Sequence, residues 1–222
     1  MKSKVLAGTS LGVETDSFVV SCSPNSFTYR IFVTNVLEHN DEMINAVCVL
    51  EEATDLDTVH LYINTPGGSV DSALMLYNSL LETKAHTVAE CSGHVASAGT
   101  MILMACDQIK VSPHTVFLFH TSSTGVFGNS SEIKNHSQFH EQWNDSLIRG
   151  IYGDFLTEPE YKEMLSYGKD ILMSSEQFIE RYNSTSKQNE ISFDMLKKFS
   201  KETLIQLILG EKRLNIETGE IV

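Results

Sequence analysis

The chain has 222 residues, 41% of them hydrophobic, which is enough for one sizeable core. Its formal net charge is -13, with 29 acidic against 16 basic residues. This balance argues against a nucleic-acid partner, because binding to a phosphate backbone needs clustered Lys and Arg. There is no secretory signal and no apolar run of bilayer length, so we expect a cytoplasmic protein without a membrane segment.

The four cysteines, Cys22, Cys48, Cys91 and Cys106, are isolated and form no CxxC pair. Single thiols in mostly apolar surroundings are typical of reduced core cysteines in cytoplasmic proteins. We therefore expect buried, reduced thiols, and no thiol catalysis at Cys91 or Cys106.

Strands and helices alternate through the first 120 residues. Residues 1–26 predict a flexible N-terminal arm, with one short strand at 17–20 as an alternative. Alternation of this kind implies parallel strands with right-handed crossovers, so the expected fold class is α/β. The other predicted strands cover 27–33, 58–64, 87–89, 109–111 and 115–119, and predicted helices begin near residues 40, 69 and 98.

Beyond His120 the pattern becomes helical. A long polar helix is expected at about 131–153, and capping boxes that start at Thr157 and Ser174 predict two further helices. Polar residues 184–190 predict a linker, followed by an amphipathic helix at about 192–209 and an alternating tail at 214–222. The predicted organisation is therefore an arm, 1–26, a main domain, 27–183, and a C-terminal extension, 184–222.

One turn combines the features that a serine nucleophile needs. Ser97 lies between a strand and an apolar helical run, with Val95-Ala96 before it and Ala98-Gly99 after it. Small neighbours let a substrate carbonyl approach, and a helix N-terminus offers free backbone N–H groups. The same features suit an ordinary tight turn, so this stretch alone leaves both interpretations open.

Serine catalysis also requires a base, a group that orients the base, and donors for the oxyanion. His120 follows an apolar strand and would emerge at its carboxyl end, where sites of open α/β sheets gather. Asp170 precedes three apolar residues, which suggests partial burial, and Gly67-Gly68 could turn N–H groups into a cavity. Taken singly, each also fits a structural role: a strand-end histidine, a loop acid and a Pro-Gly turn.

Other histidines are weaker candidates. His94 is too close in sequence to Ser97 to act as its base, and His136 and His140 lie in a segment that is not HExxH. We expect the last two on a solvated helix face rather than at a metal ion. No phosphate-binding glycine motif is present, so no cofactor is expected.

Four segments together resemble the proteolytic subunit of the Clp protease. Their order, Ser then His then Asp, and the spacings 97 to 120 and 120 to 170 match that family, and the resemblance covers about residues 27–182. The segments are Ile63-Asn64-Thr65-Pro66-Gly67-Gly68-Ser69-Val70, Gly93-His94-Val95-Ala96-Ser97-Ala98-Gly99, Phe119-His120 and Lys169-Asp170-Ile171-Leu172-Met173-Ser174.

The resemblance implies a crotonase/ClpP-like spiral of ββα units with a protruding handle helix. Ser97 would be the nucleophile, His120 the base and then the acid, and Asp170 the group that fixes the imidazole tautomer. Gly68 and Ala98 would supply the oxyanion-hole N–H groups. The implied function is a cofactor-free serine endopeptidase that hydrolyses unfolded polypeptides inside a homo-oligomeric ring, a heptamer or tetradecamer, fed by an AAA+ unfoldase.

The sequence departs from the family pattern at several positions. Thr121-Ser122 stand where the family has Gln-Pro, Asn35 stands for a Gly, and Lys169 replaces an Arg that family members use between rings. Three other functions stay open: a maturation peptidase of the same fold, a non-catalytic ring or scaffold subunit, and a crotonase-type enzyme acting on acyl-thioesters. The Ser-His-Asp order argues against the last, and retention of all three candidates argues against the non-catalytic subunit.

Overall fold

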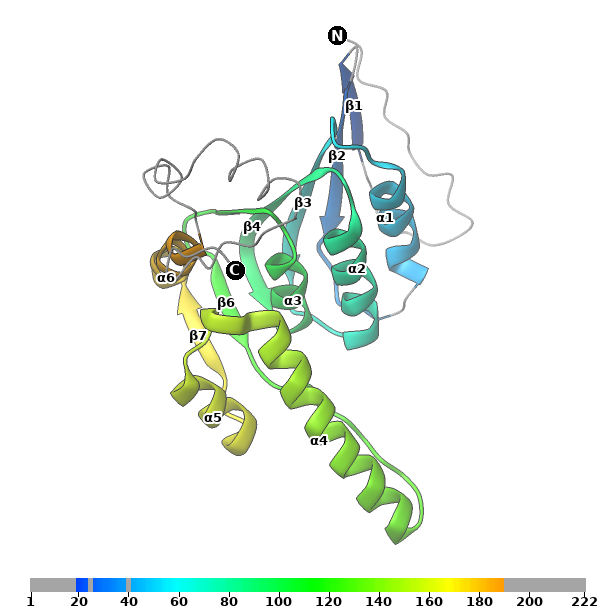
Figure 1. Ribbon diagram of the computed structural model, residues 1–222, viewed down its shortest axis with the longest axis vertical. Coiled ribbons are helices and arrows are strands. Elements are labelled where there is room, and N and C mark those ends of the chain that lie inside the picture. The colour runs from blue at the N-terminus through cyan, green and yellow to red at the C-terminus, as the bar shows by residue number, and fades with distance from the viewer. Residues whose placement is uncertain (1–18, 24–25, 39–40, 190–222) are drawn as a thin grey trace, which may run out of the picture. The chain divides into compact units, whose positions relative to one another are not determined.

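A computed structural model describes residues 19–23, 26–38 and 41–189 of the chain (Figure 1). The chain divides into two compact units, Met1–Phe178 and Ile179–Val222. The predicted helix at 192–209, the predicted tail at 214–222 and most of the predicted N-terminal arm lie outside the described residues.

The described part of the first unit is built on a seven-stranded sheet. The interior pairs β2–β3, β3–β4, β4–β5 and β4–β6 are parallel, whereas the edge pairs β1–β2 and β6–β7 are antiparallel. The predicted α/β class is confirmed, and β7 is an additional strand that we did not predict. In sheet order the strands are β1 (Val19–Ser23), β2 (Ser26–Val33), β3 (Thr58–Thr65), β4 (His86–Ala96), β6 (Val116–Phe119) and β7 (Ile171–Ser174), and β5 (Gln108–Val111) pairs with β4.

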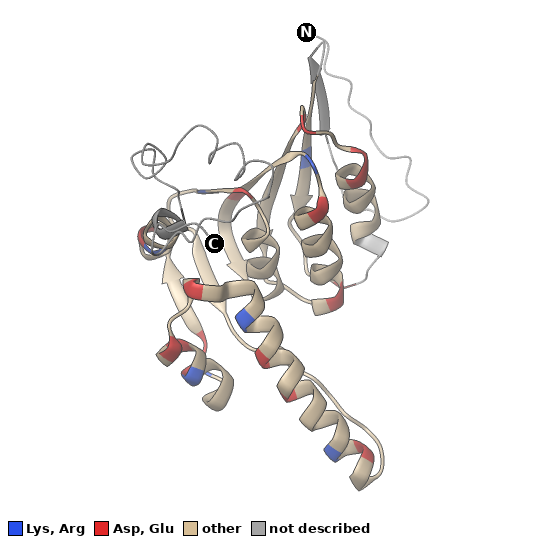
Figure 2. Ribbon diagram, in the orientation of Figure 1, with Lys and Arg blue, Asp and Glu red and all other residues tan. Residues whose placement is uncertain are grey.

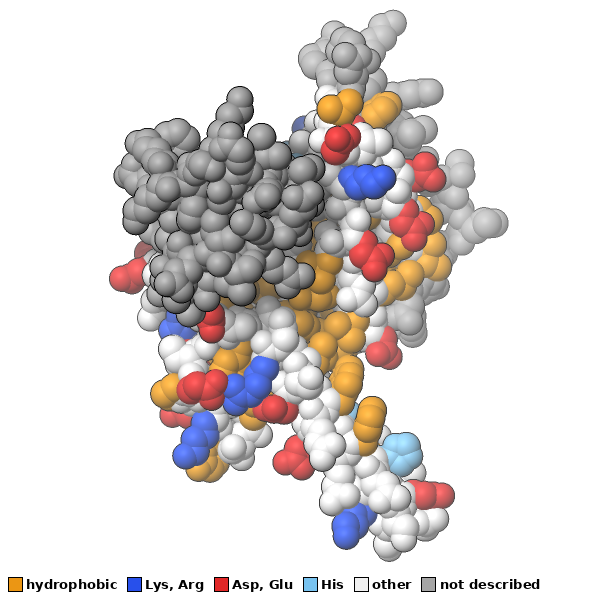
Figure 3. Space-filling view, in the orientation of Figure 1, with side chains coloured by type: hydrophobic (Ala, Val, Ile, Leu, Met, Phe, Trp, Pro, Cys, Tyr) orange, Lys and Arg blue, Asp and Glu red, His pale blue; other side chains and the backbone are white. Residues whose placement is uncertain are grey.

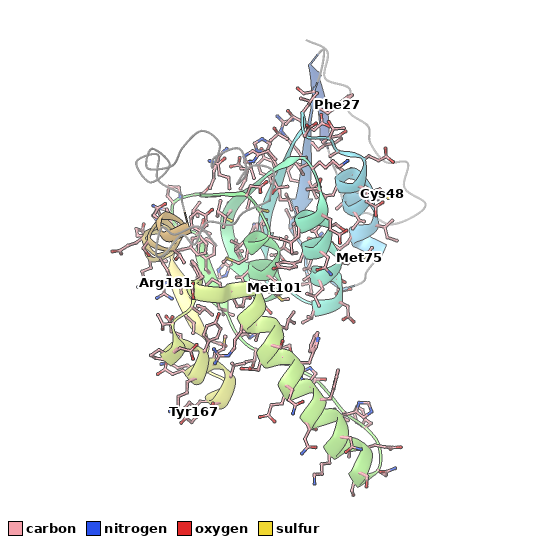
Figure 4. All side chains as sticks on the ribbon, in the orientation of Figure 1. Phe27, Cys48, Met75, Met101, Tyr167 and Arg181 are labelled. Carbon is pink, nitrogen blue, oxygen red and sulfur yellow. The ribbon has the colours of Figure 1, made fainter. Side chains whose placement is uncertain are left out.

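Three helices cover one face of the sheet: α1 (Asp41–Glu52), α2 (Val70–Glu82) and α3 (Ala98–Met104) (Figure 1). The alternation of a strand explains the core beneath them, because Val59, Leu61 and Ile63 of β3 are fully buried while the residues between them are partly exposed. The Met101 side chain, labelled in Figure 4, belongs to the same core on α3.

The helix α4 (Ser130–Tyr152) extends away from the sheet and provides the handle that the resemblance implied (Figure 1). Asn129 and Glu132 form a capping box at its start. Its last turns are anchored, since Ile148 and Tyr152 are buried and the Tyr152 hydroxyl lies 2.7 Å from Thr100 Oγ1 of α3. Figure 3 shows hydrophobic side chains over α1 and α2 and along the end of α4 nearest the sheet.

Two capping boxes predicted from the sequence are present. Thr157 caps α5 (Glu158–Tyr167), and Ser174 with Gln177 caps α6 (Ser175–Asn189); a short 3₁₀ turn, η1 (Gly153–Phe155), precedes α5. Among the described residues, no helix is both long and apolar enough to cross a bilayer.

Figure 2 shows Lys and Arg scattered singly over the described helices and strands.

The predicted linker at 184–190 is wrong, because α6 continues through Asn189. The hydroxyls of Ser184 and Thr185 both donate to the carbonyl oxygen of Arg181, so these side chains bond to their own helix. Composition could not distinguish a polar helix from a linker here. The boundary between 183 and 184 stays a prediction.

Among the three cysteines whose burial the structure describes, one departs from expectation. Cys91 and Cys106 are buried free thiols, as predicted, but Cys48 is exposed on α1 (Figure 4). Burial, with the charge of Glu90 nearby, raises the pKa of Cys91 to about 12. The thiol is therefore protonated, which agrees with the prediction that Cys91 is not a nucleophile.

Candidate active site

Ser97 occupies the one-residue corner between β4 and α3, with φ 55° and ψ -124°. Positive φ is unfavourable for a residue with a side chain, so the surrounding structure must hold it in place. The Ser97 N–H donates to the carbonyl oxygen of Leu118 on β6 at 2.8 Å. The Ser97 carbonyl accepts from the N–H and the hydroxyl of Thr100, at 2.8 and 2.6 Å. The turn is fixed on both sides of the serine.

The glycine pair after β3 packs directly against this corner. Gly67 has φ +95°, and a Cβ there would lie 2.7 Å from Ser97 Cβ and 3.0 Å from the Ala98 nitrogen. Only a residue without a side chain permits this approach. Gly68, at φ +144°, lies against the backbone of Leu37, where a Cβ would overlap the Leu37 carbonyl oxygen.

The backbone N–H groups of Gly68 and Ala98 were predicted as the oxyanion donors, and this stays a prediction. The Leu37 N–H donates to Gly67 O and the Leu37 carbonyl accepts from Ser69 N, so Leu37 and Gly68 form a parallel β-bridge. In such a bridge the hydrogen bonds are made by the residues on either side of Gly68, and the N–H of Gly68 points away from Leu37. Ala98 is the first residue of α3, where an N–H has no acceptor within the helix. Gly68 and Ser97 line the same cavity.

The sheet register brings His120 and Asp170 together. Phe119 at the end of β6 pairs with Ile171 at the start of β7, so the next residue along β6 and the one before β7 are opposite one another. His120 Nδ1 lies 3.7 Å from Asp170 Oδ1, an ion-pair distance longer than a hydrogen bond. The sequence suggested partial burial of Asp170, and its side chain, next to the edge strand β7, is 53% exposed.

The imidazole of His120 is 36% exposed, and its Nδ1 is the nitrogen that lies beside Asp170. Since Nδ1 is the nitrogen nearest Asp170, Nε2 is left for a group inside the cavity. His120 and Ser97 both line that cavity, which has a volume of about 650 Å³. Its other lining residues are Pro66, Gly68, Ser69, Val70, Asp71, Ser122, Ser123, His140 and Trp143.

Sequence reasoning missed part of this lining. His140 was expected on a solvated helix face, but it is half-buried, lines the cavity and lies beside Trp143, with 5.7 Å between ring centroids. His136 is exposed as predicted. Asp71 could have been found, because it lies in the first turn of the helix that follows the glycine pair. Trp143 could not, because only the path of α4 brings it to this cavity.

Two other acids near the Ser97 stretch in the sequence have different partners. Glu90 lies 2.9 Å from His60 Nδ1 and 3.0 Å from Lys110 Nζ. Burial would raise the pKa of Glu90, but these two partners outweigh it and lower the pKa. Asp107 accepts from the N–H and hydroxyl of Thr87. Neither acid is recorded in contact with His120.

Comparison with known proteins identifies the family of this chain. A model of the Clp protease family matches residues 27–181, more than half of the chain. The chain belongs to the Clp protease family.

Two relatives give the degree of similarity within this family. The ATP-dependent Clp protease proteolytic subunit of Deinococcus radiodurans is 27% identical over 151 residues, which are 66% of this chain and 74% of that protein. The ATP-dependent Clp protease proteolytic subunit 2 of Pseudomonas aeruginosa is 25% identical over 155 residues, 68% of this chain and 76% of that protein. The chain is thus a divergent member with a ClpP-like fold.

The positions that depart from the family pattern have partners within this chain. Lys169 Nζ lies 2.6 Å from Glu163 Oε2 of α5. The Ser122 hydroxyl donates to Asn144 Oδ1 at 2.9 Å and so ties the segment after His120 to α4. The carbonyl of Asn35 accepts from the Thr65 hydroxyl. Among the residues that the structure describes, no group of three His, Cys, Asp or Glu side chains could hold a metal ion.

Proposed function

We propose that this chain is a serine-type endopeptidase in which Ser97, His120 and Asp170 form the catalytic triad. The observation that carries the proposal is the shared cavity. It holds a serine at a strained strand-to-helix corner together with a histidine whose other nitrogen faces an aspartate. This order of roles is the geometry by which triads are recognised on unrelated folds.

The chemistry follows from the positions of these groups. Ser97 Oγ attacks the scissile carbonyl and transfers its proton to His120 Nε2, which then protonates the leaving amine. Asp170 keeps the proton of the neutral imidazole on Nδ1 and stabilises the imidazolium. The free N–H groups of Gly68 and Ala98 would bind the oxyanion. Water then hydrolyses the acyl-enzyme by the reverse sequence. The 3.7 Å separation of His120 and Asp170 is compatible with this role, because such contacts tighten when substrate binds.

The same proposal covers substrates and assembly. We infer that extended, unfolded polypeptides reach Ser97 within a homo-oligomeric ring in which α4 contacts other copies. The names of the two relatives call them ATP-dependent, which supports an AAA+ unfoldase as the partner here. We place the protein in the cytoplasm, where the free thiols of Cys91 and Cys106 would stay reduced.

The proposed triad is tested by comparing two histidines. Replacing His120 with Ala should lower hydrolysis of a fluorogenic peptide by about 10⁶-fold, as removal of the base does in triad enzymes. Ser97→Ala should cause a similar loss and abolish labelling by a fluorophosphonate. The matched control is His94→Ala, because His94 is exposed and lies close to Ser97 in sequence.

The readouts are the steady-state rate and the mass of the labelled protein. Labelling on Ser97 that requires His120 but not His94 would support the triad. Equal rates in the wild type and in His120→Ala, or labelling that survives Ser97→Ala, would contradict it.

A further inference from the structure

The cavity that contains Ser97 carries one carboxylate among its lining residues and no Lys or Arg. That carboxylate belongs to Asp71, in the first turn of α2, two residues beyond the N-cap Ser69. The remaining polar groups of the lining are hydroxyls, backbone groups and the imidazoles of His120 and His140. The formal charge of the cavity is therefore negative wherever these imidazoles are neutral.

Asp71 is exposed, and within the described residues no hydrogen bond or ion pair is recorded for its side chain. Other acids of the chain differ in this respect: Glu90 lies beside His60 and Lys110, and Asp57 accepts three hydrogen bonds. A carboxylate at the first turn of a helix is favourable for the helix by itself. The position of Asp71 at the cavity of the candidate nucleophile is a second, independent feature, because Val70 and Asp71 are the residues of α2 that line that cavity.

The helix α4 contributes another part of the cavity lining. Trp143 and His140 lie there side by side, so the lining combines two aromatic rings with a carboxylate. Such a pair suits a long cationic side chain, whose methylene stem packs on the rings while its charged end meets the acid.

We propose that Asp71 is a specificity-determining residue that makes the cavity select substrates with a cationic group next to the scissile bond. This inference rests on the proposed peptidase function. The chemical class is an alkylammonium or guanidinium group, which a peptide can supply as a Lys or Arg side chain or as a free N-terminus. Acidic peptides would be disfavoured because they meet a like charge.

The chain offers a direct readout of binding, since Trp143 is its single tryptophan and lines the cavity. We would titrate the Ser97→Ala protein with non-cleaved N-acetylated tripeptide amides that differ only in Lys, norleucine or Glu, and follow Trp143 fluorescence. An otherwise identical norleucine peptide with a free N-terminus separates the two sources of the cation. Lys should bind more tightly than norleucine by about two- to fivefold, the range that exposed charge pairs give, and the preference should shrink at high salt.

The test of residue assignment is Asp71→Asn, which keeps the shape of the side chain and removes its charge. The Lys-to-norleucine affinity ratio should fall to about one, and Asp71→Lys should invert the preference toward Glu, with magnitudes on the scale of exposed charge pairs. The matched control is Glu82→Gln, the exposed acid at the other end of α2, which should leave the ratio unchanged.

These outcomes separate the specificity from the catalysis. A Lys preference that is lost in Asp71→Asn supports the inference. Equal affinities for Lys, norleucine and Glu, or a preference that survives Asp71→Asn, overturn it while fluorophosphonate labelling of Ser97 still supports the peptidase. Absence of labelling and of hydrolysis would instead overturn the proposed function, and the inference with it. A stronger response to the free N-terminus than to Lys would assign the cation to the terminal amine.

Discussion

Asp170 is the least conventional member of the proposed triad, because its side chain is half exposed and 3.7 Å from the imidazole. Water competes for an exposed carboxylate, so its contribution depends on the edge strand β7 holding it beside His120. The register of Phe119 with Ile171 is what keeps the two groups opposite one another.

We predict that Asp170→Asn lowers peptide turnover by about 10⁴-fold, the loss seen when an amide stabilises the wrong imidazole tautomer. The fold should be retained, because the Asp170 side chain is exposed. Steady-state rates with a fluorogenic peptide check the first part, and the melting temperature checks the second. An unchanged rate would mean that a different group orients His120, and a large loss of melting temperature would mean that Asp170 acts on stability.

At the scale of the elements, one buried carboxylate joins three segments. Asp57 lies just before β3 and accepts hydrogen bonds from the Phe27 N–H at 2.6 Å and from the N–H and hydroxyl of Thr54, both at 2.8 Å. These contacts link the start of β2, the turn after α1 and the start of β3. Burial would raise the pKa of Asp57, but the three donors outweigh it and lower the pKa.

We predict that Asp57→Asn lowers the free energy of unfolding by about 1–3 kcal/mol, because the new NH₂ group replaces an acceptor that faces buried donors. The control is Asp55→Asn at a neighbouring exposed position. The measurement is denaturant unfolding at neutral pH. Equal stability of Asp57→Asn and the wild type would show that the three bonds contribute nothing net.

The same carboxylate makes stability depend on pH. A group whose pKa is lower in the folded than in the unfolded state stabilises the fold above its unfolded pKa. That contribution is lost as the pH falls through the folded pKa. The difference in stability between the wild type and Asp57→Asn should therefore be full at neutral pH and shrink below about pH 4, the ordinary range for Asp. A difference that grows on acidification would contradict this account.

At the scale of the whole molecule, α4 and the loop before it expose large apolar side chains. Their exposure to water contributes no stability to an isolated chain. Phe127 is 97% exposed and Phe139 is 69% exposed. Burying a large apolar side chain is worth about 1.5–3 kcal/mol, so contacts between copies through α4 would be favourable. This supports the proposed ring assembly.

We propose that α4 joins two rings of a closed, symmetric assembly. Phe139→Asp should then lower the native particle mass to about half, because it places a charge in that proposed contact. Tyr167→Asp is the matched control, since Tyr167 is an aromatic residue that is 74% exposed at the end of α5. Native mass spectrometry measures both. An unchanged mass for Phe139→Asp, or an equal change for the control, would exclude α4 as the contact between rings.

Local patterns were sufficient for much of the fold and for nominating the site. Period-two burial in β3, the small residues around Ser97, and the capping boxes at Thr157 and Ser174 act over a few residues, so the sequence shows them directly. The order and spacing of Ser97, His120 and Asp170 could also be taken from the sequence, because they are properties of the chain alone. The prediction of a linker at 184–190 failed for the same local reason, since a polar helix and a linker share their composition.

What the sequence by itself determined was the α/β class, the strand-to-helix corner at Ser97 and the candidate residues. Only the tertiary structure decided which of them meet. The pairing of β6 with β7 brings Asp170 to His120 while Glu90 and Asp107 bond elsewhere, and the path of α4 brings Trp143 and His140 to a cavity shared with Asp71. These are contacts between segments far apart in the chain. They depend on strand register and helix direction, which the packing of the whole core sets and which no short stretch of sequence specifies.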